Sequence, residues 1–239
     1  MLKGVSITLM VIFGIILVLS LVSFTFAHSG SKILEKETLK QGFVDFVEKQ
    51  LIEESGLEEI QRDETEILDK CDNNQSTSLD FSGENVTVSC DDIRSTNLTY
   101  AVGNALFEKL YSKENNCTWE VWHCIENSDG KFLISHGFSD YVKKIALFSL
   151  IISIISIIVL FLVKTSLKSF FLETGLCFII SALISWLPAH VLMKKLDFLI
   201  LNKFYSNLII LVISIAIIGV ILFVMQFFVK GKKISKKSK

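Results

Sequence analysis

The chain has 239 residues, of which 51% are hydrophobic, and it carries 24 basic and 25 acidic side chains. Four runs contain no charged residue: 4–27, 145–163, 174–193 and 204–229. A helix needs roughly 20 apolar residues to cross a bilayer core about 30 Å thick. The distribution therefore excludes an ordinary soluble protein and predicts an all-α integral membrane protein with four transmembrane helices.

The charged residues are sorted along the chain. Residues 28–143 hold 23 acidic and 11 basic side chains, a net charge of −12, and the rest holds 13 basic and 2 acidic ones, a net charge of +11. An acidic segment of this length between two spans predicts a folded domain outside the bilayer. Its charge argues against a nucleic-acid partner, because phosphates are bound by Lys and Arg.

The first run lies in residues 1–27, which we expect to form an uncleaved signal-anchor helix. Their apolar stretch is longer than the 7–15 residues of a signal-peptide core. The alternative is cleavage after Ala27, where Thr25, Phe26 and Ala27 form a tolerable cleavage site. Cleavage would leave three spans and the same placement of the acidic domain.

We expect the acidic domain, residues 28–143, to be mainly helical. Apolar residues recur every three or four positions over residues 32–54 and, more weakly, over 57–70, as in amphipathic helices. Alternating apolar residues on both sides of residues 82–85 favour a short β-hairpin.

A third helix of the domain is expected to begin at a cap formed by Ser95 or Thr96 and to end near residue 112. Residues 115–130 are loop-like and contain Trp119 and Trp122. These two side chains would serve either as binding hot spots or as packing groups at a disulfide or at the membrane surface.

Four of the five cysteines lie in the acidic domain: Cys71, Cys90, Cys117 and Cys124. An even number of cysteines outside the cytosol is typical of disulfide bonds. Proximity along the chain favours the pairs Cys71–Cys90 and Cys117–Cys124.

A metal site is the alternative use of these cysteines. Its ligands would be Cys117, Cys124, His123 and His136. Zinc sites usually have more closely spaced Cys pairs, so we predict disulfides and no metal. The fifth cysteine, Cys177, lies in the third span and is expected to be an inert thiol.

The acidic domain also contains the only Asn-x-Ser/Thr triplets of the chain, which begin at Asn74, Asn85, Asn97 and Asn116. Such triplets are acceptors for N-glycosylation on the external side of a membrane. Chance occurrence in an Asn-rich segment is the alternative interpretation.

Residues 144–229 are expected to form a three-helix transmembrane region, with helices over 145–163, 170–193 and 204–229. Small residues recur on one face of the second and third spans, where they would let helices pack closely in lipid. They are Ala146, Ser149, Ser153, Ser156, Ser181 and Ser185. Packing within one chain and homo-oligomerisation both fit this pattern.

Charge inside a membrane usually marks a transport path or a sensor, and the four runs contain none. Glu173 lies at the end of the third span, where pairing with Lys164 or Lys168 is expected. The spans therefore argue against active transport.

Lysines in the short loops predict the orientation by the positive-inside rule. With both termini in the cytosol, nine Lys lie on the cytosolic side, six of them in the tail 230–239. The opposite side then has three: Lys194, Lys195 and Lys203. We expect a plasma or cell membrane protein with residues 28–143 outside the cytosol; the alternative treats Lys236 and Lys237 as a dilysine retrieval signal of the endoplasmic reticulum.

The chain has no G-x-S-x-G, H-E-x-x-H, Walker or dinucleotide-binding motif, and we expect no cofactor. Its layout resembles that of claudin-type tetraspans, but Trp119 and Trp122 do not fit the W…GLW…C…C pattern of claudins. The resemblance implies a shared topology only.

We expect a non-enzymatic tetraspan membrane protein whose external domain binds a protein partner or organises an assembly. The alternatives are a channel or transport accessory subunit and a membrane enzyme with an unrecognised site.

Overall fold

The computed structural model describes residues 2–55, 65–69, 71, 76–81, 84–111, 135–164, 166–193 and 199–229. The chain divides into two compact units, which are considered separately. The bundle unit comprises Met1–Ile33 and Tyr141–Lys239, and the hairpin unit comprises Leu34–Asp140.

The bundle unit is built from long helices: α1 (Leu2–Ile33), α7 (His136–Val163, from Tyr141 onward), α8 (Leu167–Met193) and α9 (Leu199–Phe228). Each contains a stretch long and apolar enough to cross a membrane: Ile7–Ile33, His136–Val163, Leu167–Pro188 and Lys203–Phe228. The predicted set of four such helices in a mostly helical protein is confirmed.

The helices extend beyond the uncharged runs. α1 continues to Ile33 rather than ending at residue 27, and α7 begins at His136, well before residue 145. Backbone hydrogen bonds within a helix do not depend on lipid, so a helix continues into polar sequence until a local signal ends it. Hydropathy therefore marks the part of each helix suited to lipid and leaves its ends undetermined.

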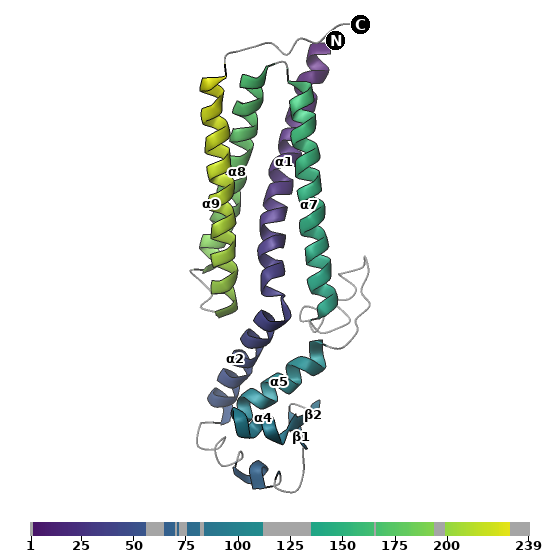
Figure 1. Ribbon diagram of the computed structural model, residues 1–239, viewed down its shortest axis with the longest axis vertical. Helices are drawn as coiled ribbons and strands as arrows, with labels where there is room; N and C mark the ends of the chain where they lie inside the picture. Colours follow the sequence, from purple (N-terminus) through teal and green to yellow (C-terminus); the bar gives the residue numbers. More distant parts are fainter. Residues whose placement is uncertain are drawn as a thin grey trace. The chain divides into compact units, whose positions relative to one another are not determined.

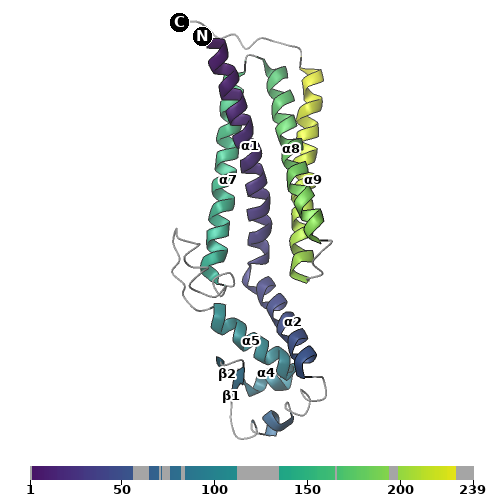
Figure 2. The same ribbon diagram turned by 180° about the vertical axis from the view of Figure 1, so that it is seen from behind.

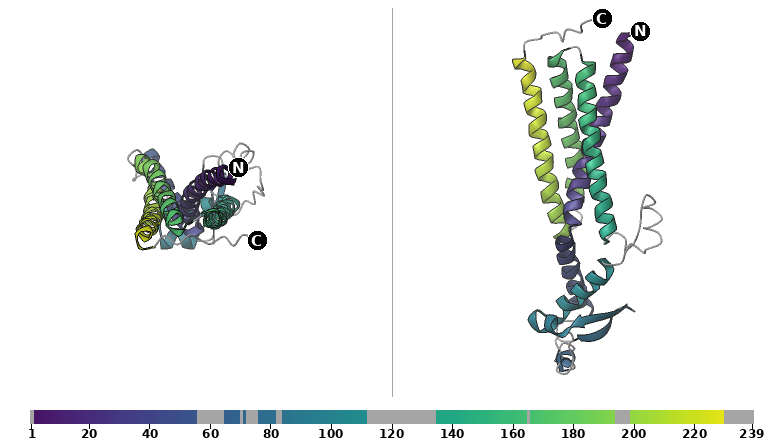
Figure 3. Two further views of the ribbon diagram at one scale, coloured as in Figure 1. Left: turned by 90° about the horizontal axis from the view of Figure 1, so that it is seen from above. Right: turned by 45° about the vertical axis from the view of Figure 1, so that its right-hand side comes forward.

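The four helices run side by side; α8 packs along α9, α1 packs against both α8 and α9, and α7 touches α1 through Ser153 and Ser20 (Figure 1; Figure 3, left). The start of α1 and the end of α9 lie at the same end of the bundle. At the other end, Gly30 of α1 lies against Val142 of α7, 3.7 Å from the position of an added Cβ. The chain therefore leaves the bundle after α1 and re-enters it in α7 at one end.

The exposed surface of α7 within the bundle unit is strongly apolar. Phe148, Ile155 and Leu162 are 66%, 50% and 65% exposed. The buried positions of the same helix within the bundle unit carry small side chains, except for Leu160. This distribution is the reverse of that in a water-soluble bundle, and it suits helices with lipid around them.

The backbones of α8 and α9 come close to each other at two glycines. A Cβ on Gly175 would lie 2.8 Å from the backbone nitrogen of Phe223 and 2.9 Å from the carbonyl oxygen of Gly219. A Cβ on Gly219 would in turn lie 3.1 Å from the carbonyl oxygen of Gly175. At Gly175 a Cβ would be too close to backbone atoms, and at Gly219 its neighbours would have to shift by a few tenths of an ångström, so the two glycines permit the close approach of the helices.

The hairpin unit contains α2 (Lys36–Ser55), β1 (Ser76–Phe81), β2 (Glu84–Ser89), α4 (Cys90–Ser95) and α5 (Leu98–Tyr111) (Figure 2). β1 and β2 pair antiparallel, with Leu79 opposite Val86, so the predicted hairpin is confirmed. The helix expected over 32–54 begins later, at Lys36, because α1 extends to Ile33. The short helix α4 was not predicted.

The start of α5 differs from the prediction. The capping residue is Asn97, whose Oδ1 accepts a hydrogen bond of 2.7 Å from the backbone N–H of Tyr100. The hydroxyl groups of Ser95 and Thr96 instead donate back to the carbonyl oxygen of Asp92 in α4. The unpredicted helix α4 therefore uses the two residues that were expected to cap α5.

One part of the core of the hairpin unit lies between the hairpin and α5. Val86 and Val88 of β2 are 2% and 1% exposed, and they pack with Ile93, Val102 and Leu106. On another face of α5, Gly103 lies against α2, where an added Cβ would be 3.3 Å from the Cα of Val44.

Replacement of Gly175 by Ala is expected to force α8 and α9 apart, because the new methyl group meets backbone atoms that cannot rotate away. The expected loss of stability is about 1–3 kcal/mol, measured by unfolding of the full chain in detergent micelles. Gly14→Ala is the matched control, since its Cβ would meet only the Cys177 Sγ at 3.8 Å. Equal stability of the two variants would contradict the assigned role of Gly175.

Candidate functional site

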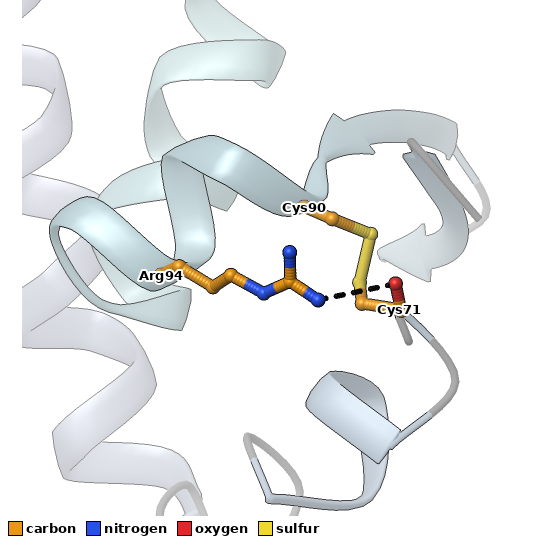
Figure 4. The surroundings of a disulfide bond; sticks show 3 residues. All are labelled: Cys71, Cys90 and Arg94. Carbon is orange, nitrogen blue, oxygen red and sulfur yellow. Dashed lines mark hydrogen bonds between the residues drawn. A yellow bond between two sulfur atoms is a disulfide. The ribbon is translucent and has the colours of Figure 1, made fainter. Parts of the chain in front are cut away.

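The Cys71–Cys90 disulfide is the pairing that proximity favoured, and it is buried in the hairpin unit (Figure 4). The two cysteines are 2% and 1% exposed, and their Cα atoms are 5.7 Å apart. Cys90 follows directly after β2, so the bond joins the end of the hairpin to the segment that precedes β1. The Arg94 guanidinium donates a hydrogen bond of 3.3 Å to the carbonyl oxygen of Cys71.

Charged and aromatic side chains join α2 to the end of α5. Lys36 Nζ lies 2.8 Å from one carboxylate oxygen of Glu108, and Lys40 Nζ lies 3.6 Å from the other. The hydrogen bond from Lys36 lowers the pKa of Glu108 and raises the pKa of Lys36 itself. Lys36 Nζ also lies 5.6 Å from the ring centre of Tyr111, and burial raises the pKa of that phenol.

Tyr111 also connects α5 to the first turn of α7. Its hydroxyl group lies 3.2 Å from Nδ1 of His136, and Nε2 of His136 lies 3.4 Å from a carboxylate oxygen of Asp140. Phe107 stacks on Tyr111 with 5.2 Å between ring centres and packs against Phe43 of α2 at 5.9 Å. Tyr111 and His136, which lie on either side of residues 112–134 in the sequence, are therefore in direct contact.

Two of the four glycosylation triplets are described, and they lie in different settings. Asn85 lies in β2 and is exposed, whereas Asn97 is partly buried and caps α5. Asn74 and Asn116 lie outside the described residues.

Several other predicted site residues also lie outside the described residues. They are Cys117, Cys124, His123, Trp119, Trp122 and the tail 230–239. Of the alternative metal ligands only His136 is described, with Tyr111 and Asp140 as its neighbours. No group of three or more His, Cys, Asp or Glu side chains suited to a metal ion occurs among the described residues.

The six residues expected to mediate helix packing are all buried: Ala146, Ser149, Ser153, Ser156, Ser181 and Ser185. Ser153 Oγ lies 2.8 Å from Ser20 Oγ, which links α7 to α1. Ser181 donates a hydrogen bond to the carbonyl oxygen of Cys177 at 2.7 Å and lies 3.5 Å from that of Val18 in α1. In lipid such bonds between helices stabilise association by about 0.6 kcal/mol each on average.

The sequence reasoning missed Gly175 and Gly219. The available signal was a glycine in the apolar part of each of two consecutive spans, where glycine usually marks close backbone approach. The pairing itself depends on how α8 and α9 are aligned, which the sequence pattern leaves open.

A charged group lies at the end of the bundle where α7 ends and α8 begins. Lys164 is 5% exposed and forms an ion pair with Glu173, and its Nζ donates a hydrogen bond of 3.3 Å to Ser169 Oγ. Pairing of Glu173 with Lys164 or Lys168 was expected, and Lys164 is the partner. At the opposite end, His190 stacks on Trp186 at 5.1 Å and lies 3.5 Å from the Tyr205 hydroxyl.

Comparison with protein-family models, with curated proteins and with solved structures found no match for this chain.

Replacing both Cys71 and Cys90 by Ala is expected to destabilise the hairpin unit by about 3 kcal/mol, because the unfolded chain gains the entropy that the closed loop removes. Hydrogen exchange of β2 and α5 in the full chain under increasing urea measures this loss. Cys177→Ala, which removes the free thiol of the bundle unit, is the control and should leave that exchange unchanged. Unaltered protection in the double variant would contradict the prediction.

Glu108→Gln is expected to lower the stability of the hairpin unit by roughly 0.5 kcal/mol at neutral pH, since the ion pairs are partly exposed. The pKa of Glu108 is lowered in the folded state, so this stabilisation is present above the ordinary value of 4.5 and is lost as the pH falls below it. The difference between wild type and variant, measured by urea denaturation, should therefore vanish in acid. A difference that persists below pH 3 or is insensitive to salt would contradict the assignment.

Proposed function

We propose that the protein is a non-enzymatic tetraspan membrane protein that presents its hairpin unit outside the cytosol as a module for binding another protein. The observation that carries the proposal is that a unit with its own core and a buried disulfide is inserted between α1 and α7. The binding function is inferred from this architecture.

The connections of the bundle support this topology. α1 and α7 meet near Gly30 and Val142, so both connections to the hairpin unit leave the bundle at one end. The start of α1 and the end of α9 lie together at the opposite end (Figure 1). In a bilayer, the hairpin unit would lie on one side of the membrane. The start of α1 and the end of α9 would lie on the other side.

Charge and redox chemistry favour the external side for the hairpin unit. Disulfides persist in oxidising compartments and are rare in the cytosol, and Cys71–Cys90 is fully buried in the unit core. Residues 28–143 carry a net charge of −12, and this orientation would place most short-loop and tail lysines on the opposite, cytosolic side, as the positive-inside rule predicts. The four Asn-x-Ser/Thr triplets would then all lie on the glycosylated side.

The contacts within the bundle support a holding role. Polar contacts between its helices include Ser20 with Ser153, Cys177 with the Gly14 carbonyl oxygen and Ser181 with the Val18 carbonyl oxygen. Such contacts fix helices against one another in lipid. An anchored bundle of this kind would hold a binding module at the membrane surface.

Labelling of intact cells with a membrane-impermeant amine reagent, followed by cross-linking of native membranes and mass spectrometry, tests the proposal. The exposed Lys49 and Lys109 of the hairpin unit should react in intact cells and should form cross-links to another protein. Lys168, exposed at the start of α8, is the control and should react only after permeabilisation. Labelling of Lys168 alone would overturn the orientation, and cross-links to other copies of the chain alone would replace a partner-binding role by homo-oligomerisation.

A further inference from the structure

The strand β2 presents Asn85 and Thr87 on the outer face of the hairpin. Successive side chains of a strand point to opposite faces, and Val86 and Val88 point into the core with 2% and 1% exposure. Asn85 and Thr87 therefore share the other face, where both are exposed. The fold converts the triplet Asn85-Val86-Thr87 into an accessible amide and an accessible hydroxyl on one surface.

The contacts of Asn85 leave its amide nitrogen available. Ser78 Oγ, on the neighbouring strand, donates a hydrogen bond to Asn85 Oδ1, and Lys109 Nζ donates one of 2.9 Å to the Asn85 carbonyl oxygen. Over the part of the chain that the structure describes, Nδ2 of Asn85 donates no hydrogen bond. The exposed side chain is thus held by a hydrogen bond to its oxygen and by none from its nitrogen.

Asn97 begins the other described triplet, and its surroundings differ. Its Oδ1 accepts hydrogen bonds from the Tyr100 N–H at 2.7 Å and from the Thr99 hydroxyl at 2.9 Å. Leu98 and Thr99 are 8% and 5% exposed. The second and third residues of this triplet are packed into the first turn of α5. A transferase could therefore not bind them in the folded unit.

We propose that Asn85 is an N-glycosylation site of the folded hairpin unit and that Asn97 serves as a helix cap. The proposal rests on the proposed function, because the donor and its transferase act outside the cytosol. The donor is an oligosaccharide linked through phosphate to a lipid.

In the transfer, Nδ2 of Asn85 loses a proton to a base of the transferase and bonds to the anomeric carbon of the sugar. The bond between that carbon and the phosphate oxygen breaks, and the lipid phosphate leaves with the electron pair. No oxidant or reductant is needed. The glycan then covers the face of the hairpin that carries Ser78 and Thr87, so a protein partner would bind elsewhere on the unit.

Glycopeptide mass spectrometry of the full chain, purified from cells that perform N-glycosylation, tests this assignment. A glycan is expected on Asn85 and is lost in Asn85→Gln and in Thr87→Val, a change that keeps the β-branched shape. Thr87→Ser keeps the hydroxyl and should retain the glycan. Asn104→Gln, outside any triplet, and Asn97→Gln are controls that should leave the glycan on Asn85.

Labelling of Lys49 in the same intact cells separates the two proposals. If Asn85 carries no glycan and Lys49 is labelled, the glycosylation proposal is overturned and the proposed orientation is retained. If Asn85 carries no glycan and Lys49 is not labelled, both the glycosylation proposal and the proposed orientation are overturned. Occupancy of Asn97 equal to or higher than that of Asn85 overturns the preference between the two sites.

Discussion

The bundle depends on close contact between small side chains, because lipid supplies no hydrophobic force that drives helices together. Large apolar groups such as Phe148 and Leu162 face outward. Gly175 and Gly219 let the backbones of α8 and α9 approach, and the serine face of α7 meets Ser20 of α1. Dispersion contacts and a few hydrogen bonds at short range therefore hold the helices, and extra volume at the interface works against them.

The hairpin unit is held together in the opposite way, because its apolar side chains are buried in a core that excludes water. A unit of about 100 residues buries limited apolar surface, and the described core lies on two faces of α5, one packed with Val86, Val88 and Ile93 and the other with Val44 of α2. The Cys71–Cys90 bond lies within that core and ties both ends of the hairpin region together. A covalent link of this kind compensates for a small core and suits an oxidising compartment. The stability of the unit and its proposed external location thus have a common chemical basis.

The packing of the bundle and the buried core of the hairpin unit both support the proposed role. The bundle would hold the chain in the membrane through packing, and some of its buried hydroxyl groups, such as those of Ser153 and Ser181, form hydrogen bonds with the helix backbone. The hairpin unit has exposed charge and an exposed strand face, which are the properties of a surface that meets other molecules. A glycan at Asn85 would divide that surface into a covered face and a face open to a protein.

The sequence by itself determined the features that rest on local pattern. The four helices follow from uncharged runs, the hairpin follows from alternation around residues 82–85, and the Cys71–Cys90 pair follows from proximity along the chain. In each case the decisive residues lie within about 25 positions of one another, and the period of a helix or a strand or the length of a loop connects them directly.

Only the tertiary structure decided the pairings between distant residues. The contact of Gly175 with Gly219, the choice of Lys164 over Lys168 as the partner of Glu173, and the bond between Ser20 and Ser153 depend on the axial alignment of helices. The choice of Asn97 as the cap of α5 depended on the unpredicted helix α4, which used Ser95 and Thr96. A repeating apolar pattern does not determine the axial alignment of one helix relative to another. Close packing of particular side chains determines it.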